Sequence, residues 1–182
     1  MEREFSTVEE LRQWLQSRQI DLGAWGHGEA KSVSDLWSEI VRGESELSDD
    51  PLQRQVEVVR VIIRRGESIL IEAQQELRGG RRRARGRPPS EKMKPGESYR
   101  ETALRCLEEE LGVPPEEARI LPDTYRRKTW EGYSASYPGL CTQYTFHIVR
   151  AEVDGLPLDG FTTAETKPGP GEPVARHHWV WR

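Results

Sequence analysis

The 182-residue sequence predicts an α/β fold, in which a β-sheet packs against helices, preceded by a short two-helix extension. Two Val- and Ile-rich segments that meet at the Gly66 turn predict paired strands. Further along, residues 139–153 alternate apolar and polar side chains, which is typical of a half-buried strand. One helical segment stands between these regions, so we expect a helix against the sheet. The segments predicted to contain strands are 54–66, 67–77, 119–133, 139–153 and 177–182.

Two helices are predicted before the sheet. Residues 6–18 carry a capping box at their start and an apolar stripe at helical spacing. Residues 32–43 show a second stripe that ends at a glycine. A polar linker then leads into the Val- and Ile-rich strands. We therefore expect residues 1–50 to form a helical extension and residues 51–182 the main domain.

The helix between the strands has well-defined ends. Ser98 is a suitable N-cap, and Glu101 three residues later completes a capping box. Gly112 ends the helix, and the two prolines that follow prevent its continuation. The sequence therefore predicts a helix over residues 98–111.

One strip of this helix carries a thiol and two carboxylates. At about 100° per residue, Glu109 and Glu110 lie within about 60° of Cys106, whereas Glu108 lies on the far side. The strip borders the apolar face that we expect to be buried. Such an edge commonly lines a cleft, which favours a chemical role; the alternative is that residues 108–110 are a solvated charge run.

The spacing of these residues resembles the box of the Nudix family. In that family the order is Gly, five residues, Glu, seven residues, then Arg-Glu-apolar-any-Glu-Glu-any-Gly-apolar. The positions in register are Glu97, Arg105, Leu107, Glu109, Glu110, Gly112 and Val113. Two positions differ, because Glu91 stands in place of the first Gly and Cys106 in place of the Glu after Arg105.

The resemblance implies a mixed β-sheet sandwiched between helices and a site built on the box helix. In the family, the acids that match Cys106, Glu109 and Glu110 hold Mg²⁺, which prefers oxygen ligands. The catalytic candidates are Glu97, Arg105, Glu109 and Glu110. The candidate ligands for Mg²⁺ or Mn²⁺ are Glu97, Glu109 and Glu110.

Cys106 changes what the resemblance implies about activity. A thiol is a soft ligand that suits zinc or copper rather than magnesium. Loss of even an outer partner of a metal ligand typically costs about 10- to 100-fold in affinity or activity. We therefore expect weak or lost hydrolysis, although the three remaining acids could still hold one ion.

The segment 77–97 is the most unusual by charge, with six arginines between Arg78 and Arg87. Guanidinium groups hold phosphates through paired hydrogen bonds, so a grip on an anionic ligand is one interpretation. The candidate ligand-binding residues are Arg81, Arg82, Arg83, Arg85 and Lys94. A solvated loop and an RNA-binding arm stay open as alternatives, and the lack of interleaved aromatic residues weakens the RNA interpretation.

Composition limits the possible partners and compartment. The formal net charge of −4 offers no general attraction to nucleic acid or to a membrane. The two cysteines are too few for a disulfide framework. No apolar stretch approaches the roughly 20 residues that span a bilayer, and the acidic start lacks an apolar signal core. We expect a cytoplasmic or other soluble intracellular protein without a membrane partner.

Three functional interpretations follow. The preferred one is a module on a Nudix scaffold that binds a nucleotide-linked or other phosphorylated small molecule, with hydrolysis weak or lost. The second is an active Mg²⁺-dependent pyrophosphohydrolase of a nucleoside diphosphate derivative. The third is a protein- or RNA-interaction domain that uses the arginine-rich segment.

Overall fold

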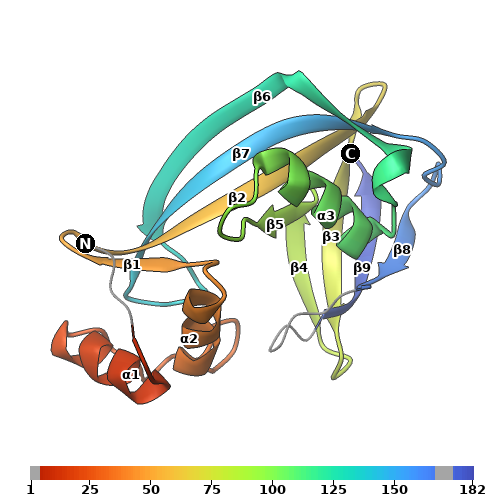
Figure 1. Cartoon of the computed structure of the whole chain (residues 1–182). Coiled ribbons are helices and arrows are strands. Elements are labelled where there is room, and N and C mark those ends of the chain that lie inside the picture. The colour runs from red at the N-terminus through yellow and green to blue at the C-terminus, as the bar shows by residue number, and fades with distance from the viewer. Residues whose placement is uncertain (1–4, 167–173) are drawn as a thin grey trace. The chain divides into compact units, whose positions relative to one another are not determined.

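A computed structural model describes residues 5–166 and 174–182 and groups the chain into two compact units (Figure 1). The first unit contains the described part of Met1–Glu57 together with Thr129–Thr145, and the second contains the described parts of Val58–Lys128 and Phe146–Arg182. Three long strands contribute to both units. They are β2 (Leu52–Arg65), β6 (Ala118–Tyr133) and β7 (Cys141–Val153). The division at residue 50 expected from the sequence stays a prediction about domains.

The first unit contains the two N-terminal helices that the sequence predicts. They are α1 (Val8–Ser17) and α2 (Val33–Val41), and β1 (Glu46–Asp49) pairs antiparallel with the start of β2. Thr7 accepts a hydrogen bond from the backbone N–H of Glu10 at the start of α1. Ser32 and Asp35 form a complete capping box at the start of α2. The apolar faces of both helices enter one core, which includes Leu11, Trp14, Leu15, Trp25, Leu36 and Tyr137.

A buried ion pair lies beside this core. The Nη2 atom of Arg54 is 2.6 Å from Oε2 of Glu39, and each side chain is 2 % exposed. Ser45 donates to the same Glu39 oxygen and accepts from Nε of Arg54. The guanidinium group also lies over the ring of Tyr137, 4.9 Å from its centroid. Because each charge is buried and matched, we expect removal of one partner to be costly.

The second unit is a sheet with α3 (Tyr99–Leu111) against one face. The strand order is β6-β7-β2-β3-β9-β8, with β4 paired to β3 and β5 paired to β2. The remaining strands are β3 (Ser68–Leu77), β4 (Arg82–Arg87), β5 (Ser90–Lys92), β8 (Phe161–Ala164) and β9 (Val174–Trp181). A short 3₁₀ turn, η1 (Pro115–Glu117), follows α3. The predicted α/β fold is therefore confirmed.

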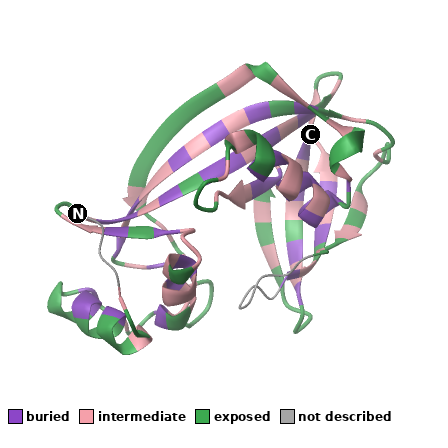
Figure 2. Cartoon of the chain, in the orientation of Figure 1, coloured by how far each residue is buried: buried purple, intermediate pink, exposed green. Residues whose placement is uncertain are grey.

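The core of the second unit forms where the apolar side of α3 meets the strands. Figure 2 shows buried residues interspersed with more exposed ones along β2 and β7, as expected for strands whose side chains point alternately to the two faces of a sheet. The helix contributes Ala103, Cys106, Leu107 and Leu111. The strands contribute residues such as Val61, Leu70, Val149 and Trp179.

Two segments differ from what the sequence predicts. No strand is predicted in the arginine-rich segment, but residues 82–87 form β4 because their backbone pairs with β3. Residues 162–175, rich in Pro and Gly, lie between predicted strands, but β8 and the start of β9 enter this range, and residues 167–173 lie outside the described residues. Among residues 5–166 and 174–182, no helix is long and apolar enough to cross a membrane.

Candidate functional site

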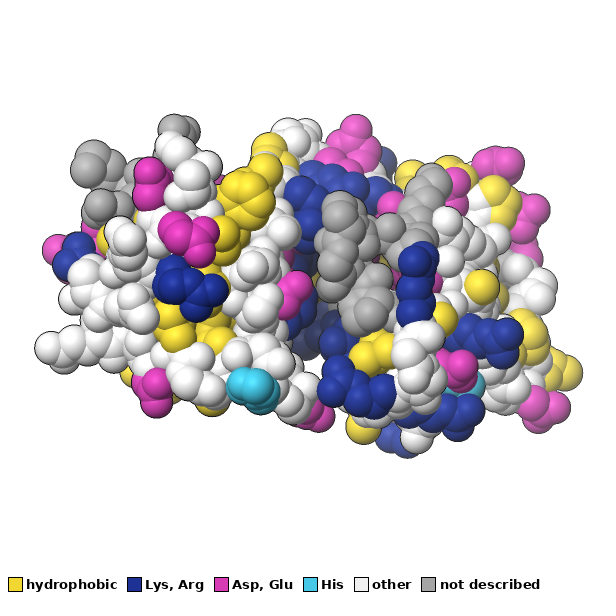
Figure 3. All heavy atoms as spheres, turned by 90° about the horizontal axis from the view of Figure 1, so that it is seen from below, with side chains coloured by type: hydrophobic (Ala, Val, Ile, Leu, Met, Phe, Trp, Pro, Cys, Tyr) yellow, Lys and Arg dark blue, Asp and Glu magenta, His cyan; other side chains and the backbone are white. Residues whose placement is uncertain are grey.

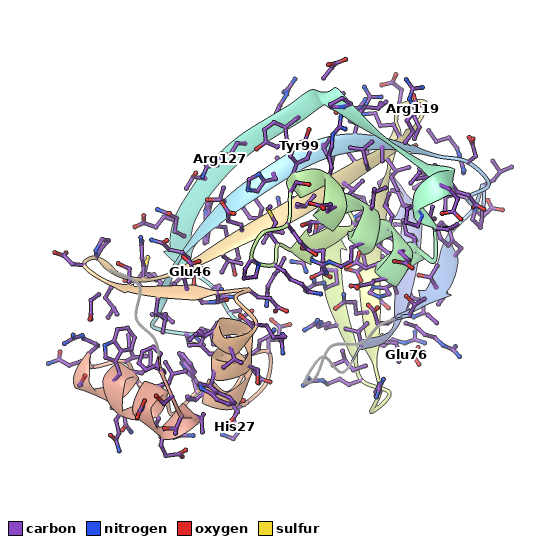
Figure 4. The ribbon with its side chains drawn as sticks, viewed as in Figure 1. His27, Glu46, Glu76, Tyr99, Arg119 and Arg127 are labelled. Atoms are coloured by element: carbon purple, nitrogen blue, oxygen red, sulfur yellow. The ribbon has the colours of Figure 1, made fainter. Side chains whose placement is uncertain are left out.

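The box helix begins and ends as the sequence predicts. Ser98 accepts a hydrogen bond from the backbone N–H of Glu101, whose side chain accepts from the N–H of Ser98 in return. Gly112 adopts the left-handed conformation, with φ of 69°, that ends many helices. Tyr99, labelled in Figure 4, fixes the first turn by packing its ring 4.4 Å from that of Tyr125.

The predicted strip lies deeper than the edge of the apolar face. Cys106 is 0 %, Glu109 9 % and Glu110 5 % exposed. Carboxylates with so little water need partners inside the protein. Those partners divide the strip into two clusters.

The first cluster is centred on Arg105. Its Nε and Nη2 atoms donate to the two carboxylate oxygens of Glu97, at 2.9 and 2.8 Å. Its Nη1 atom lies 3.4 Å from Glu109 and 3.8 Å from Glu91, the residue that replaces the first glycine of the box. Its Nη2 atom also donates to the carbonyl oxygen of Lys92. Arg105 therefore joins three carboxylates and the end of β5.

The ionisation of this Arg105 cluster follows from these contacts. Burial opposes the charge of Glu97, but hydrogen bonds from Arg105, the backbone N–H of Lys94 and the hydroxyl of Thr102 lower its pKa to about 2. Burial raises the pKa of Glu109, although the charges of Arg105 and Lys94 oppose the shift. Glu97 is thus fully ionised near neutral pH, and Glu109 is the more easily protonated acid.

The second cluster is centred on His177 of β9, and we call it the His177 cluster. The Nδ1 atom of His177 lies 2.6 Å from Oε1 of Glu72, and Nε2 lies 3.1 Å from Oε2 of Glu165. Arg85 donates to the other oxygen of Glu72 at 3.1 Å. Glu110 faces this cluster, because the charges of both Glu72 and His177 act on its ionisation. The members are Glu72, Arg85, Glu110, Glu165 and His177.

The ionisable groups of the His177 cluster shift one another's pKa values in opposite directions. Burial disfavours the charged form of His177, but the hydrogen bonds that its ring donates to Glu165 and Glu72 outweigh burial and raise the pKa to about 9. Burial likewise disfavours the charge on Glu72, whose pKa is nevertheless lowered by His177 and Arg85. The pKa of Glu110 is raised well above its usual value by burial and by the nearby charge of Glu72.

Cys106 lies against Glu110, and its thiol donates to Oε2 of that residue at 3.8 Å. Burial and the charge of Glu110 raise the pKa of Cys106 well above its usual value. The thiol is therefore protonated near neutral pH, in the position where the family has a carboxylate.

These residues do not fit a three-carboxylate magnesium site. Glu97 uses both oxygens on Arg105, and one of them also accepts from Thr102 and Lys94. Glu110 is directed into the buried side of the strip beside a protonated thiol. Within residues 5–166 and 174–182, no three His, Cys, Asp or Glu side chains are placed to hold a metal ion. The geometry thus keeps Glu97 and Glu109 together on Arg105 and turns Glu110 toward Cys106 and the His177 cluster.

The predicted ligand-binding arginines of β4 differ in how far they are buried. Figure 3 shows several Lys and Arg side chains gathered on the face that it draws. Arg83 and Arg85 are half-buried, and Arg83 donates to Gln75 while Arg85 donates to Glu72. Arg82 is exposed and lies 3.6 Å from Glu76. Arg81 is also exposed, in the turn before β4, and Lys94 is exposed in the turn before α3. Through its side chain, Arg85 thus contacts Glu72, a buried acid of the His177 cluster.

Three residues of the His177 cluster were not singled out by the sequence. Glu72 is one acid in an otherwise strand-like segment, and Glu165 precedes a Pro/Gly-rich stretch. The alternation of His177 with Trp179 did indicate that one of the two adjacent histidines points inward. Only the pairing of β3 with β9, which brings Gln75 opposite His177, places Glu72 within reach.

Comparison with known proteins gives one family match. A family model described as "NUDIX domain" matches residues 52–176, which is more than half of the chain. A Nudix hydrolase from Nitrosomonas europaea is 18 % identical, with a TM-score of 0.42, over 68 % of this chain and 70 % of that one. A C. elegans Ap4A hydrolase binary complex is 14 % identical, with a TM-score of 0.38, over 69 % and 77 %. No curated protein matches the chain.

Proposed function

Because the chain belongs to the Nudix family, we propose that it binds a nucleotide-linked or other phosphorylated ligand and that its metal-dependent hydrolysis is weak or lost. The observation that carries the second part is the buried, protonated thiol of Cys106 in the place of a box carboxylate. The first part rests on the exposed cations Arg81, Arg82 and Lys94.

Weak hydrolysis follows from what phosphoryl transfer needs from a protein. The protein contributes positioning and electrostatic stabilisation, much of it through metal ions held by carboxylates. Cys106 supplies neither charge nor a hard ligand, and the raised pKa of Glu110 favours its neutral form. Glu97 is the acid with a lowered pKa, but Arg105 already binds both of its oxygens.

Binding of a phosphorylated ligand is supported by exposed cations before and at the start of β4 and before α3. Arg81, Arg82 and Lys94 are exposed, and the charge of Lys94 acts on Glu109 of the box helix. Guanidinium groups recognise phosphate oxygens through paired hydrogen bonds, and an ammonium group does so as a point charge. We expect these three side chains to contact the ligand and Arg83 and Arg85 to hold β4 in place.

The test is binding of pyrophosphate and ADP, with and without Mg²⁺, measured by calorimetry and by thermal shift. A ligand that binds the folded chain raises its melting temperature by mass action. We expect binding to the wild type and at least about fivefold weaker binding to the Arg82→Ser/Lys94→Ser variant, as loss of one net hydrogen bond or more predicts.

The matched control is Arg119→Ser, which removes one exposed cation at the other end of the second unit from Glu76, the partner of Arg82 (Figure 4). We expect this variant to bind like the wild type. Absence of binding for every phosphorylated probe, or equal weakening by the control, would contradict the proposed ligand class.

A further inference from the structure

His177 is the most completely enclosed charged group of the His177 cluster. Its side chain is 1 % exposed and stacks on Trp179, with ring centroids 5.8 Å apart and an interplanar angle of 22°. Each ring nitrogen faces a different carboxylate, Glu72 at Nδ1 and Glu165 at Nε2. A carboxylate accepts a hydrogen bond when ionised, so both contacts are satisfied together only when both nitrogens carry a proton. When both carboxylates are ionised, this geometry favours the imidazolium form.

The same contacts lead from His177 to the end of the box helix. Glu165 belongs to the segment 163–166, whose neighbouring residues bind the last turn of α3. Thr163 donates to the carbonyl oxygen of Glu110 and accepts from the indole N–H of Trp179 at 2.8 Å. The backbone N–H of Thr166 donates to the carbonyl oxygen of Glu109 at 3.1 Å. The last carbonyl groups of a helix have no partner within the helix, so this segment satisfies two of them.

We propose that His177 is a positioning residue that, as a cation between Glu72 and Glu165, holds the segment 163–166 against the last turn of α3 and so fixes Glu109 and Glu110. This inference rests on the proposed function only in that these two acids belong to the ligand site. The positioning itself is a property of the folded chain without any ligand.

Loss of the proton from His177 would break one contact rather than both. A neutral imidazole has a single N–H, which stays with the shorter contact to Glu72. The lone pair on Nε2 then faces the carboxylate of Glu165 and repels it. The groups that face His177 are Glu72 from β3, Arg85 through Glu72 from β4, Glu110 from α3 and Glu165 after β8. Three of these four are acids, and Arg85 is the one cation among them.

The experiment follows the backbone amide of Thr166 by NMR hydrogen exchange, without ligand, between pH 6 and pH 10. The protection factor, which corrects for the intrinsic pH dependence of exchange, should fall at least about fivefold as the His177 ring titrates, the effect of one lost hydrogen bond. In His177→Gln the Thr166 amide should be less protected already at pH 6, and its protection should not change further up to pH 10. His178→Gln is the control, because the ring nitrogens of this neighbouring histidine contact Thr162 and Glu76 rather than Glu72 and Glu165. We expect its Thr166 protection to keep the pH dependence of the wild type.

Unchanged Thr166 protection across the titration of His177 in the wild type would overturn the proposal, even if His177→Gln does not fold. Equal loss of protection in His178→Gln would overturn it as well. Pyrophosphate affinity is measured separately on the same proteins at pH 6 and pH 10. Failure of the wild type to bind pyrophosphate would count against the proposed function alone, whereas the exchange result tests the positioning role alone.

Discussion

The raised pKa of His177 makes the stability of the second unit depend on pH in the alkaline range. A folded-state pKa of about 9, against an ordinary value of 6.5, corresponds to about 3 kcal/mol of stabilisation by the cation. Because the folded value lies above the unfolded one, this stabilisation is complete below about pH 6.5 and is lost as the pH rises to about 9. We therefore expect unfolding free energies that fall by up to about 3 kcal/mol between pH 6 and pH 10 through this residue.

The assay is urea unfolding of the wild type and of His177→Gln at both pH values, followed through the indole N–H signal of Trp179. This signal reports on the second unit, since Trp179 packs in its core. The raised pKa values of Glu109 and Cys106 also lower stability as the pH rises, and they do so in both proteins. The difference between the two pH dependences therefore reports on His177 together with Glu72 and Glu110, whose pKa values its charge shifts. Identical pH dependences in the wild type and the variant would refute the account of its charge.

Three further predictions concern other charged contacts. Glu39→Gln should lower the free energy of unfolding by about 3–5 kcal/mol, because it leaves the buried Arg54 without its carboxylate. Arg18→Gln breaks an exposed ion pair with Asp49 and should lower it by less than about 1 kcal/mol. Equal losses in urea unfolding would contradict this difference. Arg85→Gln should destabilise the second unit by at least about 1 kcal/mol, because Glu72 loses a charged partner. Arg82→Gln should change the free energy of unfolding by no more than about 0.5 kcal/mol. The reverse order in the same assay would argue against the different roles of the half-buried and the exposed arginines of β4. Arg105→Lys removes the paired contact with Glu97, so the pKa of Glu97 should rise from about 2 toward its usual 4.5. An NMR titration of the carboxyl carbon measures this pKa. An unchanged value would show that Arg105 does not control the ionisation of Glu97.

Much of the fold could be predicted because local signals decide it. The capping box at Ser98 and the stop at Gly112 fixed the box helix within one residue, and both are confirmed. The Nudix family predicted from the box is confirmed by the match over residues 52–176. The two N-terminal helices are confirmed as well, since their caps and apolar stripes are local features.

The prediction failed where side chains from distant strands meet. The arginine-rich segment has no apolar alternation, so nothing local indicated that β4 would pair with β3. Glu72 and His177 are 105 positions apart in the sequence, and only strand pairing brings them together. The roles assigned to Glu97, Arg105, Glu109 and Glu110 stay predictions. The sequence places Glu97 just before the helix and the other three on it, but it does not determine which charged partners each of them has.

The measurement that tests the central claim most directly is turnover of nucleoside diphosphate derivatives with Mg²⁺ and with Mn²⁺. The assay records phosphate or nucleotide release by the wild type beside Glu109→Gln and Glu110→Gln. The protonated thiol of Cys106 predicts a wild-type rate well below about 1 s⁻¹, the lower end of ordinary enzyme rates. A rate near or above that value that is lost in both variants would contradict weak or lost hydrolysis and establish an active hydrolase.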